Sequence, residues 1–172
     1  MATHIDASTT KDGRDITVAS DTEVSLVEYQ CVTSHGNTAV SDASDPVAVS
    51  YSPGKAVLRA PSASVKKGRV HIPVHDPPGV LDKTYALENI LVSFDVESDA
   101  SIDMVTLYYD GAKVVSTNVT RKNTFHIDFS TNEAAKYAYV LPSGICLSLD
   151  VVFQSAKSVV QLYSVTLVYR AV

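Results

Sequence analysis

His126 and Asp128 are the pair of residues in this sequence best suited to acid–base chemistry. They lie two residues apart on a predicted strand, which places both side chains on one face, ~7 Å apart at about 3.3 Å per residue. On a face that lines an interior or a cleft, they would act as acid and base or grip a ligand. The opposite face carries Phe125, Ile127 and Phe129, and this apolar row favours the alternative, in which His126 and Asp128 face solvent.

His71 and His75 form an H-x-x-x-H pattern, which on a helix would bring both rings to one face to hold a metal. They lie instead on a predicted strand, residues 69–75, where positions i and i+4 are ~13 Å apart. Two ligands at that separation cannot share one ion unless Pro73 folds the strand sharply. We therefore predict no metal site, and keep His71 as the third catalytic candidate and His75 as a ligand-binding candidate.

Four more side chains are candidates for contact with a ligand. His35 and Asn37 flank a glycine in a predicted loop, and loops carry function more often than cores do; Gly36 and Asn37 also suit a simple left-handed turn. Among nine tyrosines, Tyr108 and Tyr163 are the two that we select to stack on a sugar or an aromatic ring. The alternative is that they are half-buried strand aromatics.

The sequence contains none of the common catalytic or cofactor-binding motifs. No Gly-x-Ser-x-Gly motif occurs, and the seven glycines form no phosphate-binding loop or dinucleotide fingerprint. Carboxylates crowd a predicted turn at residues 95–103, but the ordered Asp-x-Asp-x-Asp-Gly calcium loop is missing. We predict that the protein uses no cofactor.

The composition of the 172 residues suits a single domain. We assign residues 1–22, which show no periodicity, to an extended N-terminal arm and residues 23–172 to the domain. The net charge of −5 and the short basic clusters argue against nucleic acid as a partner. No apolar run approaches the ~20 residues that cross a bilayer, and the N-terminus lacks the apolar core of a signal peptide. We expect no membrane partner and a cytoplasmic location with reduced cysteines.

Alternating apolar residues and regularly spaced turn signals predict eight to ten strands and at most one short helix, at residues 131–139. Pro53-Gly54 and Asp110-Gly111 are turn signals, and the second is typical of a type I′ hairpin. Residues 87–115 are interpreted as a central hairpin whose tip carries the carboxylates. We predict an all-β fold with two packed antiparallel sheets, a β-sandwich with jelly-roll-like topology. The absence of tryptophan disfavours an immunoglobulin-like sandwich.

The alternation near the C-terminus predicts two strands, the first of which shows the clearest core-facing row. Residues 145, 147, 149, 151 and 153 are all apolar, and Tyr163 shares its parity with Val165, Leu167 and Tyr169. In the strand at residues 69–75, Val70, Ile72 and Val74 alternate with polar positions. Since Pro73 cannot donate to a ladder, this strand is expected at a sheet edge or bend.

Three short motifs give the sequence a family resemblance. They are Ser34-His35-Gly36-Asn37, His71-Ile72-Pro73-Val74 and Leu107-Tyr108-Tyr109-Asp110-Gly111, with Gly144-Ile145 opening a late strand. With these motifs the sequence resembles an uncharacterised family of small all-β proteins found in microbes, over about residues 23–169. It departs from the family at Val70, where the family has an aromatic residue. The resemblance implies a sandwich fold and no established activity.

Two functional hypotheses follow. The first is a small soluble binding or assembly module, with a small-molecule or carbohydrate ligand and strand edges available for a homo-oligomer. The alternative is a cofactor-independent isomerase or cyclase, which would act on a small hydrophobic substrate in a pocket of the sandwich. Such an enzyme needs only a shaped cavity and one or two polar groups, so no motif would announce it.

Overall fold

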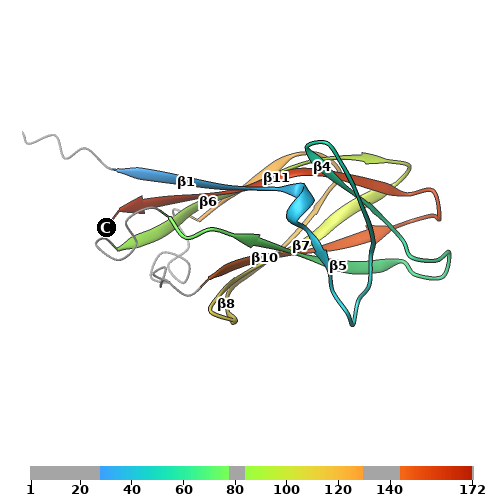
Figure 1. The fold of residues 1–172 in the computed structure, drawn as a ribbon, viewed down its shortest axis with the longest axis horizontal. Coiled ribbons are helices and arrows are strands. Elements are labelled where there is room, and N and C mark those ends of the chain that lie inside the picture. The colour runs from blue at the N-terminus through green and yellow to red at the C-terminus, as the bar shows by residue number, and fades with distance from the viewer. Residues whose placement is uncertain (1–27, 78–83, 130–143, 172) are drawn as a thin grey trace, which may run out of the picture.

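Two antiparallel β-sheets pack face to face in the computed structural model, which describes residues 28–77, 84–129 and 144–171 (Figure 1). Sheet A contains β1 (Tyr29–His35), β3 (Ala48–Ser52), β4 (Lys55–Arg59), β6 (Tyr85–Glu97), β9 (Phe125–Asp128) and β11 (Val159–Ala171). Sheet B contains β2 (Val40–Ser41), β5 (Lys67–Val74), β7 (Ala100–Tyr109), β8 (Ala112–Arg121) and β10 (Ile145–Phe153). A single 3₁₀ turn, η1 (Gly36–Thr38), is the only helical element of the described residues.

The strand order confirms the predicted all-β sandwich. Sheet A runs β3-β4-β11-β6-β9, with β1 also paired to β11, and sheet B runs β2-β5-β10-β7-β8. The chain passes back and forth between the two sheets, which gives the jelly-roll-like topology. Eleven strands are described rather than eight to ten, and one of the additional strands is the two-residue β2. The predicted arm at residues 1–22 and the predicted helix at residues 131–139 lie outside the described residues.

The predicted central hairpin is wrong in its first half. β6 belongs to sheet A and β7 to sheet B, and the turn at Ser98 and Asp99, both with positive φ, carries the chain from one sheet to the other. Within this segment the hairpin is formed by β7 and β8; elsewhere β3 and β4 form another, with the predicted turn at Pro53-Gly54. The turn residues between β7 and β8, Asp110 and Gly111, have φ values of 48° and 73°, which is the conformation expected of a type I′ turn.

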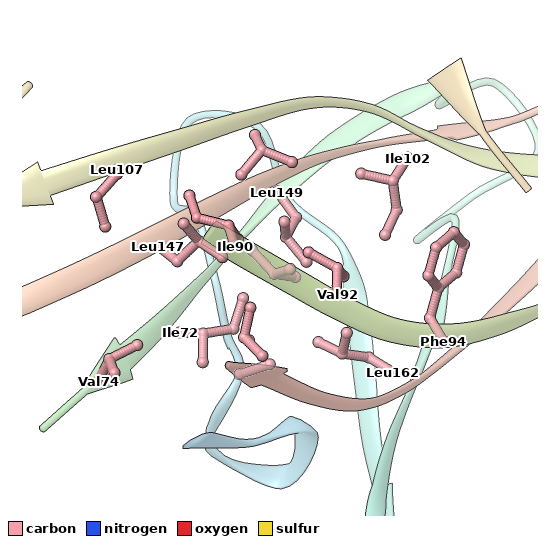
Figure 2. Close-up of a cluster of buried hydrophobic side chains, with 14 of the residues drawn as sticks. Ile72, Val74, Ile90, Val92, Phe94, Ile102, Leu107, Leu147, Leu149 and Leu162 are labelled. Atoms are coloured by element: carbon pink, nitrogen blue, oxygen red, sulfur yellow. The ribbon is translucent and has the colours of Figure 1, made fainter. Parts of the chain in front are cut away.

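The facing sides of the two sheets form one apolar core (Figure 2). All five predicted inward residues of β10 are buried, from Ile145 to Phe153. Across the gap they meet sheet A residues such as Ile90, Val92 and Leu162. The hydroxyls of Tyr109 and Tyr169 pair at 3.3 Å within this core, and burial raises the pKa of Tyr109 to about 12.

Two local features refine the predicted strand faces. A β-bulge in β11 between Leu162 and Ser164 shifts the register, so Tyr163 lies on the outer face of sheet A while Val165, Leu167 and Tyr169 are buried. The predicted single row is therefore wrong at Tyr163, because a bulge inserts one residue and breaks the two-residue period. Pro73 lies where predicted, at an edge: its carbonyl accepts the Ser34 hydroxyl at 2.7 Å, on the side of β5 away from β10.

No helix within the described ranges has the length and apolar character to cross a membrane.

Phe94→Ala should lower the free energy of unfolding by about 3–5 kcal/mol. Phe94 is fully buried and packs edge-on against Phe125, with ring centroids 5.9 Å apart and an 85° interplanar angle. Leu91→Ala is the matched control, since Leu91 lies on the same strand but is 38 % exposed; it should cost about 1 kcal/mol or less. Urea unfolding measures both changes, and equal losses would contradict the assignment of inner and outer faces.

Candidate functional site

The outer face of sheet B carries three rows of mostly polar side chains that cross β5, β10, β7 and β8. Strands alternate inward and outward residues, so the apolar inner positions of these strands leave the polar ones on the outside. The register between strands then aligns them. The rows are Arg69, Asp150, Met104 and Asn118; His71, Ser148, Thr106 and Ser116; and Pro73, Cys146, Tyr108 and Lys113.

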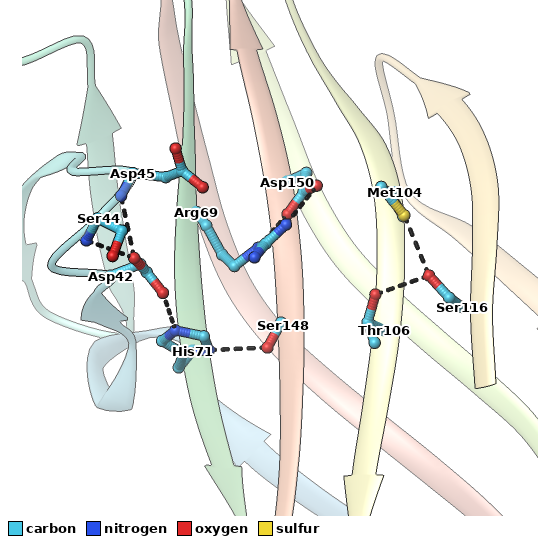
Figure 3. Close-up of polar contacts among 10 residues, drawn as sticks. All are labelled: Asp42, Ser44, Asp45, Arg69, His71, Met104, Thr106, Ser116, Ser148 and Asp150. Carbon is cyan, nitrogen blue, oxygen red and sulfur yellow. Dashed lines mark hydrogen bonds and ion pairs between the residues drawn. The ribbon is translucent and has the colours of Figure 1, made fainter. Parts of the chain in front are cut away.

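Hydrogen bonds connect the residues of the middle row in two separate groups, one of which extends to Asp42 (Figure 3). His71 Nε2 lies 2.7 Å from Asp42 Oδ2, and His71 Nδ1 lies 2.7 Å from Ser148 Oγ. Further along the row, the hydroxyls of Thr106 and Ser116 pair at 2.9 Å. Each side chain of this middle row therefore has a partner, which avoids the cost of an unsatisfied donor or acceptor.

The Asp42–His71–Ser148 network has the residue types of a serine hydrolase triad but not its accessibility. A nucleophile must reach the substrate and its base must take up a proton. Ser148 is only 1 % exposed, so its hydroxyl cannot reach a substrate, although His71 lies between Asp42 and Ser148 as the base of a triad would. The neighbouring thiol of Cys146 is also a poor nucleophile, because burial raises its pKa. This network holds shape and is not arranged for catalysis.

Asp42 is the charged end of the network. Its carboxylate accepts the backbone N–H groups of Asp45, at 3.0 Å, and Ser44, at 2.7 Å. These bonds, with the bond to His71, lower the pKa of Asp42 to about 2, and the N–H of Asp45 is the largest cause. Asp42 therefore stays ionised whenever the network is intact near neutral pH.

A pocket of 270 Å³ lies at the row that contains Arg69. Residues from β5, β10, β7, β8 and the loop before β3 line it, so it crosses the width of sheet B. Met104 provides apolar surface, while Val151 and Val152, which also line the pocket, are buried. The polar side chains that line it include Asp45, Lys67, Arg69, Asp103, Asn118 and Asp150.

Arg69 and Asp150 form a two-bond ion pair within the pocket (Figure 3). Arg69 Nε lies 2.5 Å from Asp150 Oδ1, and Nη2 lies 2.9 Å from Oδ2. This pairing raises the pKa of Arg69 above its ordinary value. Such parallel bonds fix the plane of the guanidinium, and the Nη1 group has no hydrogen bond to another described residue. The pocket thus contains an oriented donor before any ligand arrives.

The structure separates the three catalytic candidates. His71 lies on the outer face of sheet B beside the pocket row. His126 and Asp128 lie on the short strand β9 of sheet A, exposed on its outer face as the apolar Phe125 and Phe129 favoured. Because they are on opposite sides of the sandwich, His71 cannot act on the same substrate molecule as His126 and Asp128.

The ligand-binding candidates are also distributed over both sheets. Tyr108 is half-buried in the third row of sheet B, and His75 is exposed just beyond the end of β5. Tyr163 lies on the outer face of sheet A, where its hydroxyl donates to Asp95 at 2.9 Å and Lys55 Nζ lies 5.8 Å from its ring centre. Tyr163 is thus remote from the pocket.

The His35 loop forms η1, with His35 and Asn37 exposed. Gly36 does not supply the left-handed turn that its sequence context suggested, because it is not among the residues with positive φ. It is required for a different reason: a Cβ there would lie 1.9 Å from the carbonyl oxygen of Leu162. The glycine allows η1 to pack directly on β11.

None of the residues that line the pocket is among the site candidates selected from the sequence. Asp150 and Ser148 share the outward parity of β10, so the alternation of that strand was a usable signal for both. Asp42 and Asp45 belong to a loop with no regular pattern, and only the fold brings them to β5. Within the described residues, no group of three or more His, Cys, Asp or Glu side chains is arranged to hold a metal.

Comparisons with known proteins give similarity of structure alone. No protein-family model matches the sequence, and no curated protein matches it. The CBM36-1 domain of a multidomain xylanase from the hindgut metagenome of Trinervitermes trinervoides superposes with a TM-score of 0.41 at 7 % identity, over 80 % of this chain and 95 % of that domain. These values do not assign the chain to that family.

Two other carbohydrate-binding modules show similar values. TmCBM61, solved in complex with β-1,4-galactotriose, has a TM-score of 0.42 and 13 % identity, over 75 % of this chain and 85 % of that one. The family 29 module CBM29_1 of Piromyces equi has a TM-score of 0.36 and 14 % identity, over 86 % and 92 %. All three TM-scores are below 0.5. The resemblance to the uncharacterised microbial family stays a prediction.

A fluorophosphonate probe should fail to label Ser148, because the hydroxyl is buried behind His71. Mass spectrometry of the treated native protein measures the label. Ser148→Ala is the control, and it should give the same background as the wild type. Labelling of the wild type that disappears in Ser148→Ala would show that the network is a working triad.

The contribution of Asp42 to stability should decline in acid. Its pKa is about 2 in the folded protein against an ordinary value of 3.8, so its contribution is complete above about pH 4 and is lost as the pH falls through 2. The difference in unfolding free energy between wild type and Asp42→Asn should therefore shrink from pH 5 to pH 2 in urea titrations. A difference that grows in this range would contradict the hydrogen bonding of Asp42.

Proposed function

We propose that this chain is a non-catalytic binding module that holds a carbohydrate in the pocket on the outer face of sheet B. The observation that carries the proposal is the mixture of fixed donors and acceptors in one shallow polar site. Each sugar hydroxyl both donates and accepts a hydrogen bond, so a neutral polyol needs both kinds of partner side by side.

The charges in the pocket fit a neutral ligand better than an anion. Three carboxylates, from Asp45, Asp103 and Asp150, stand against two cations, from Lys67 and Arg69. A phosphate or carboxylate ligand would meet repulsion from the acids. The half-buried, apolar side chain of Met104 offers contact for the C–H surface of a sugar ring.

The extent of the site suits more than one sugar unit. The lining reaches from β5 to β8, across three interstrand spacings or ~14 Å at about 4.8 Å each. Tyr108 lies on the same face, four residues along β7 from Met104, or ~13 Å at about 3.3 Å per residue. Its ring would stack on a unit of an oligosaccharide that extends along the face beyond the pocket.

The isomerase or cyclase hypothesis gains no support from this pocket. That chemistry calls for a cavity within the sandwich, whereas the pocket described lies on an outer face and is lined by charged side chains. Association of copies through strand edges and a cytoplasmic location stay predictions.

Arg69→Met should weaken carbohydrate binding at least about tenfold, since it removes the oriented donor from a partly buried site. The measurement is a screen of the full chain on a glycan panel, followed by isothermal titration of the best oligosaccharide. Asn118→Ala, at an exposed pocket position, should weaken binding without affecting the ion pair.

Asp95→Asn is the control for both pocket variants, because Asp95 is an exposed carboxylate on sheet A. It should bind as the wild type does. Unchanged affinity in Arg69→Met and Asn118→Ala, or a loss in Asp95→Asn alone, would move the ligand away from this pocket. A wild type that binds no glycan on the panel would contradict the proposal itself.

A further inference from the structure

We propose that Asp42 and His71 are positioning residues of the pocket: they hold the loop that carries Asp45 against β5, although neither lines the pocket. This inference rests on the proposed function insofar as it concerns ligand affinity. Its structural part, the fixing of the loop, can be tested without a ligand.

Hydrogen bonds within the loop between β2 and β3 fix its conformation. Asp42 Oδ1 accepts the N–H groups of Ser44 and Asp45, so one carboxylate oxygen closes the turn that leads to Asp45 (Figure 3). Ser41 Oγ accepts the N–H of Val47 at 2.8 Å and joins the end of the loop to its beginning. The loop therefore has a defined conformation around Asp45, one of the residues that line the pocket.

The loop also contacts the pocket residues of β5 directly. Asp42 N–H donates to the Arg69 carbonyl at 2.9 Å, and Arg69 N–H donates to the Asp45 carbonyl at 2.8 Å. Gly68 lies so close beneath the loop that a Cβ would be 2.7 Å from the Pro46 carbonyl oxygen and 2.5 Å from Val47 Cγ2. A shift of the loop would therefore shift the backbone of Gly68 and Arg69.

His71 anchors the loop to sheet B through its two side-chain hydrogen bonds. Only two residue pairs join β2 to β5, Val40 with His71 and Ser41 with Val70, so the ladder alone holds the loop weakly. His71 binds Asp42 Oδ2 through one nitrogen and the buried Ser148 of β10 through the other. The imidazole thus ties the loop to the central strand of sheet B.

A fixed loop matters for affinity because ordering a flexible segment during binding costs free energy. With the anchor intact, that cost is met during folding. Without it, the loop around Asp45 must be ordered by the ligand. We expect a roughly three- to tenfold loss of affinity from such a change, with the direct pocket contacts still present.

The decisive experiment measures amide hydrogen exchange by NMR in the full chain without ligand. It compares the His71→Phe variant with the wild type. The variant keeps a ring but removes both hydrogen bonds, and it leaves the bonds from Ser44 and Asp45 to Asp42 chemically possible. We expect the amides of Ser44, Asp45 and Arg69 to exchange at least about tenfold faster relative to global unfolding. Unchanged protection at these three amides would overturn the proposal.

Thr106→Val is the matched control, because it removes one hydroxyl pair, with Ser116, from the same row two strands away. It should leave the exchange of the three loop amides unchanged. Equal loss of protection in Thr106→Val would show a general loosening of sheet B and would also overturn the proposal. If His71→Phe does not fold, His71→Ala takes its place in the same measurement.

Titration with xylohexaose and cellohexaose supplies the ligand-dependent arm. If wild type binds either sugar, His71→Phe should bind it three- to tenfold more weakly and Thr106→Val within about twofold. Faster loop exchange with unchanged affinity would overturn the positioning role. If wild type binds neither sugar, the exchange result still decides whether His71 fixes the loop, and the wider glycan panel alone decides the proposed function.

Discussion

The register of β10 between β5 and β7 is the constraint on which the rest of the structure depends. Its inward residues, including Leu147, Leu149 and Val151, are completely buried. A slip of one residue would turn this whole row toward solvent. The same register sets Asp150 beside Arg69 and Ser148 beside His71, so the packing of the core fixes the geometry of the outer face.

Polar groups on that outer face are held rather than free. Ser148 is buried and its hydroxyl needs a partner, which His71 provides, and His71 in turn orients Asp42. Arg69 is held in the same way by Asp150. With the Ser148 hydroxyl buried, this network is suited to holding the surface in one shape. Such a preformed polar surface suits a binding module.

Local periodicity explains what the sequence could predict. Alternation correctly assigned the inner and outer faces of β5, β9 and β10. The Asp110-Gly111 pair correctly predicted the hairpin turn between β7 and β8. The two-residue period of a strand predicts which of its side chains are buried, but not which strand pairs with it. For that reason the sequence wrongly predicts a hairpin of β6 and β7, which lie in different sheets.

The site was less predictable, because its residues come from distant parts of the chain. Asp42 and His71 are 29 positions apart and His71 and Ser148 are 77 apart, and no short motif encodes such pairs. His126 and Asp128 were selected on spacing, which fixes their shared face but not its distance from a pocket. Tyr163 has the same parity as the buried Val165 and Leu167, but the β-bulge in β11 turns it to the outer face. The alternation of apolar residues does not reveal such a bulge.

Chemical-shift mapping is the most direct test that a ligand occupies the outer face of sheet B. The ¹⁵N-labelled full chain would be titrated with the oligosaccharide that binds best. The account predicts that the largest shifts occur at Asp45, Arg69 and Asn118, with little change on sheet A. Shifts gathered around Tyr163 and His126 instead would contradict it.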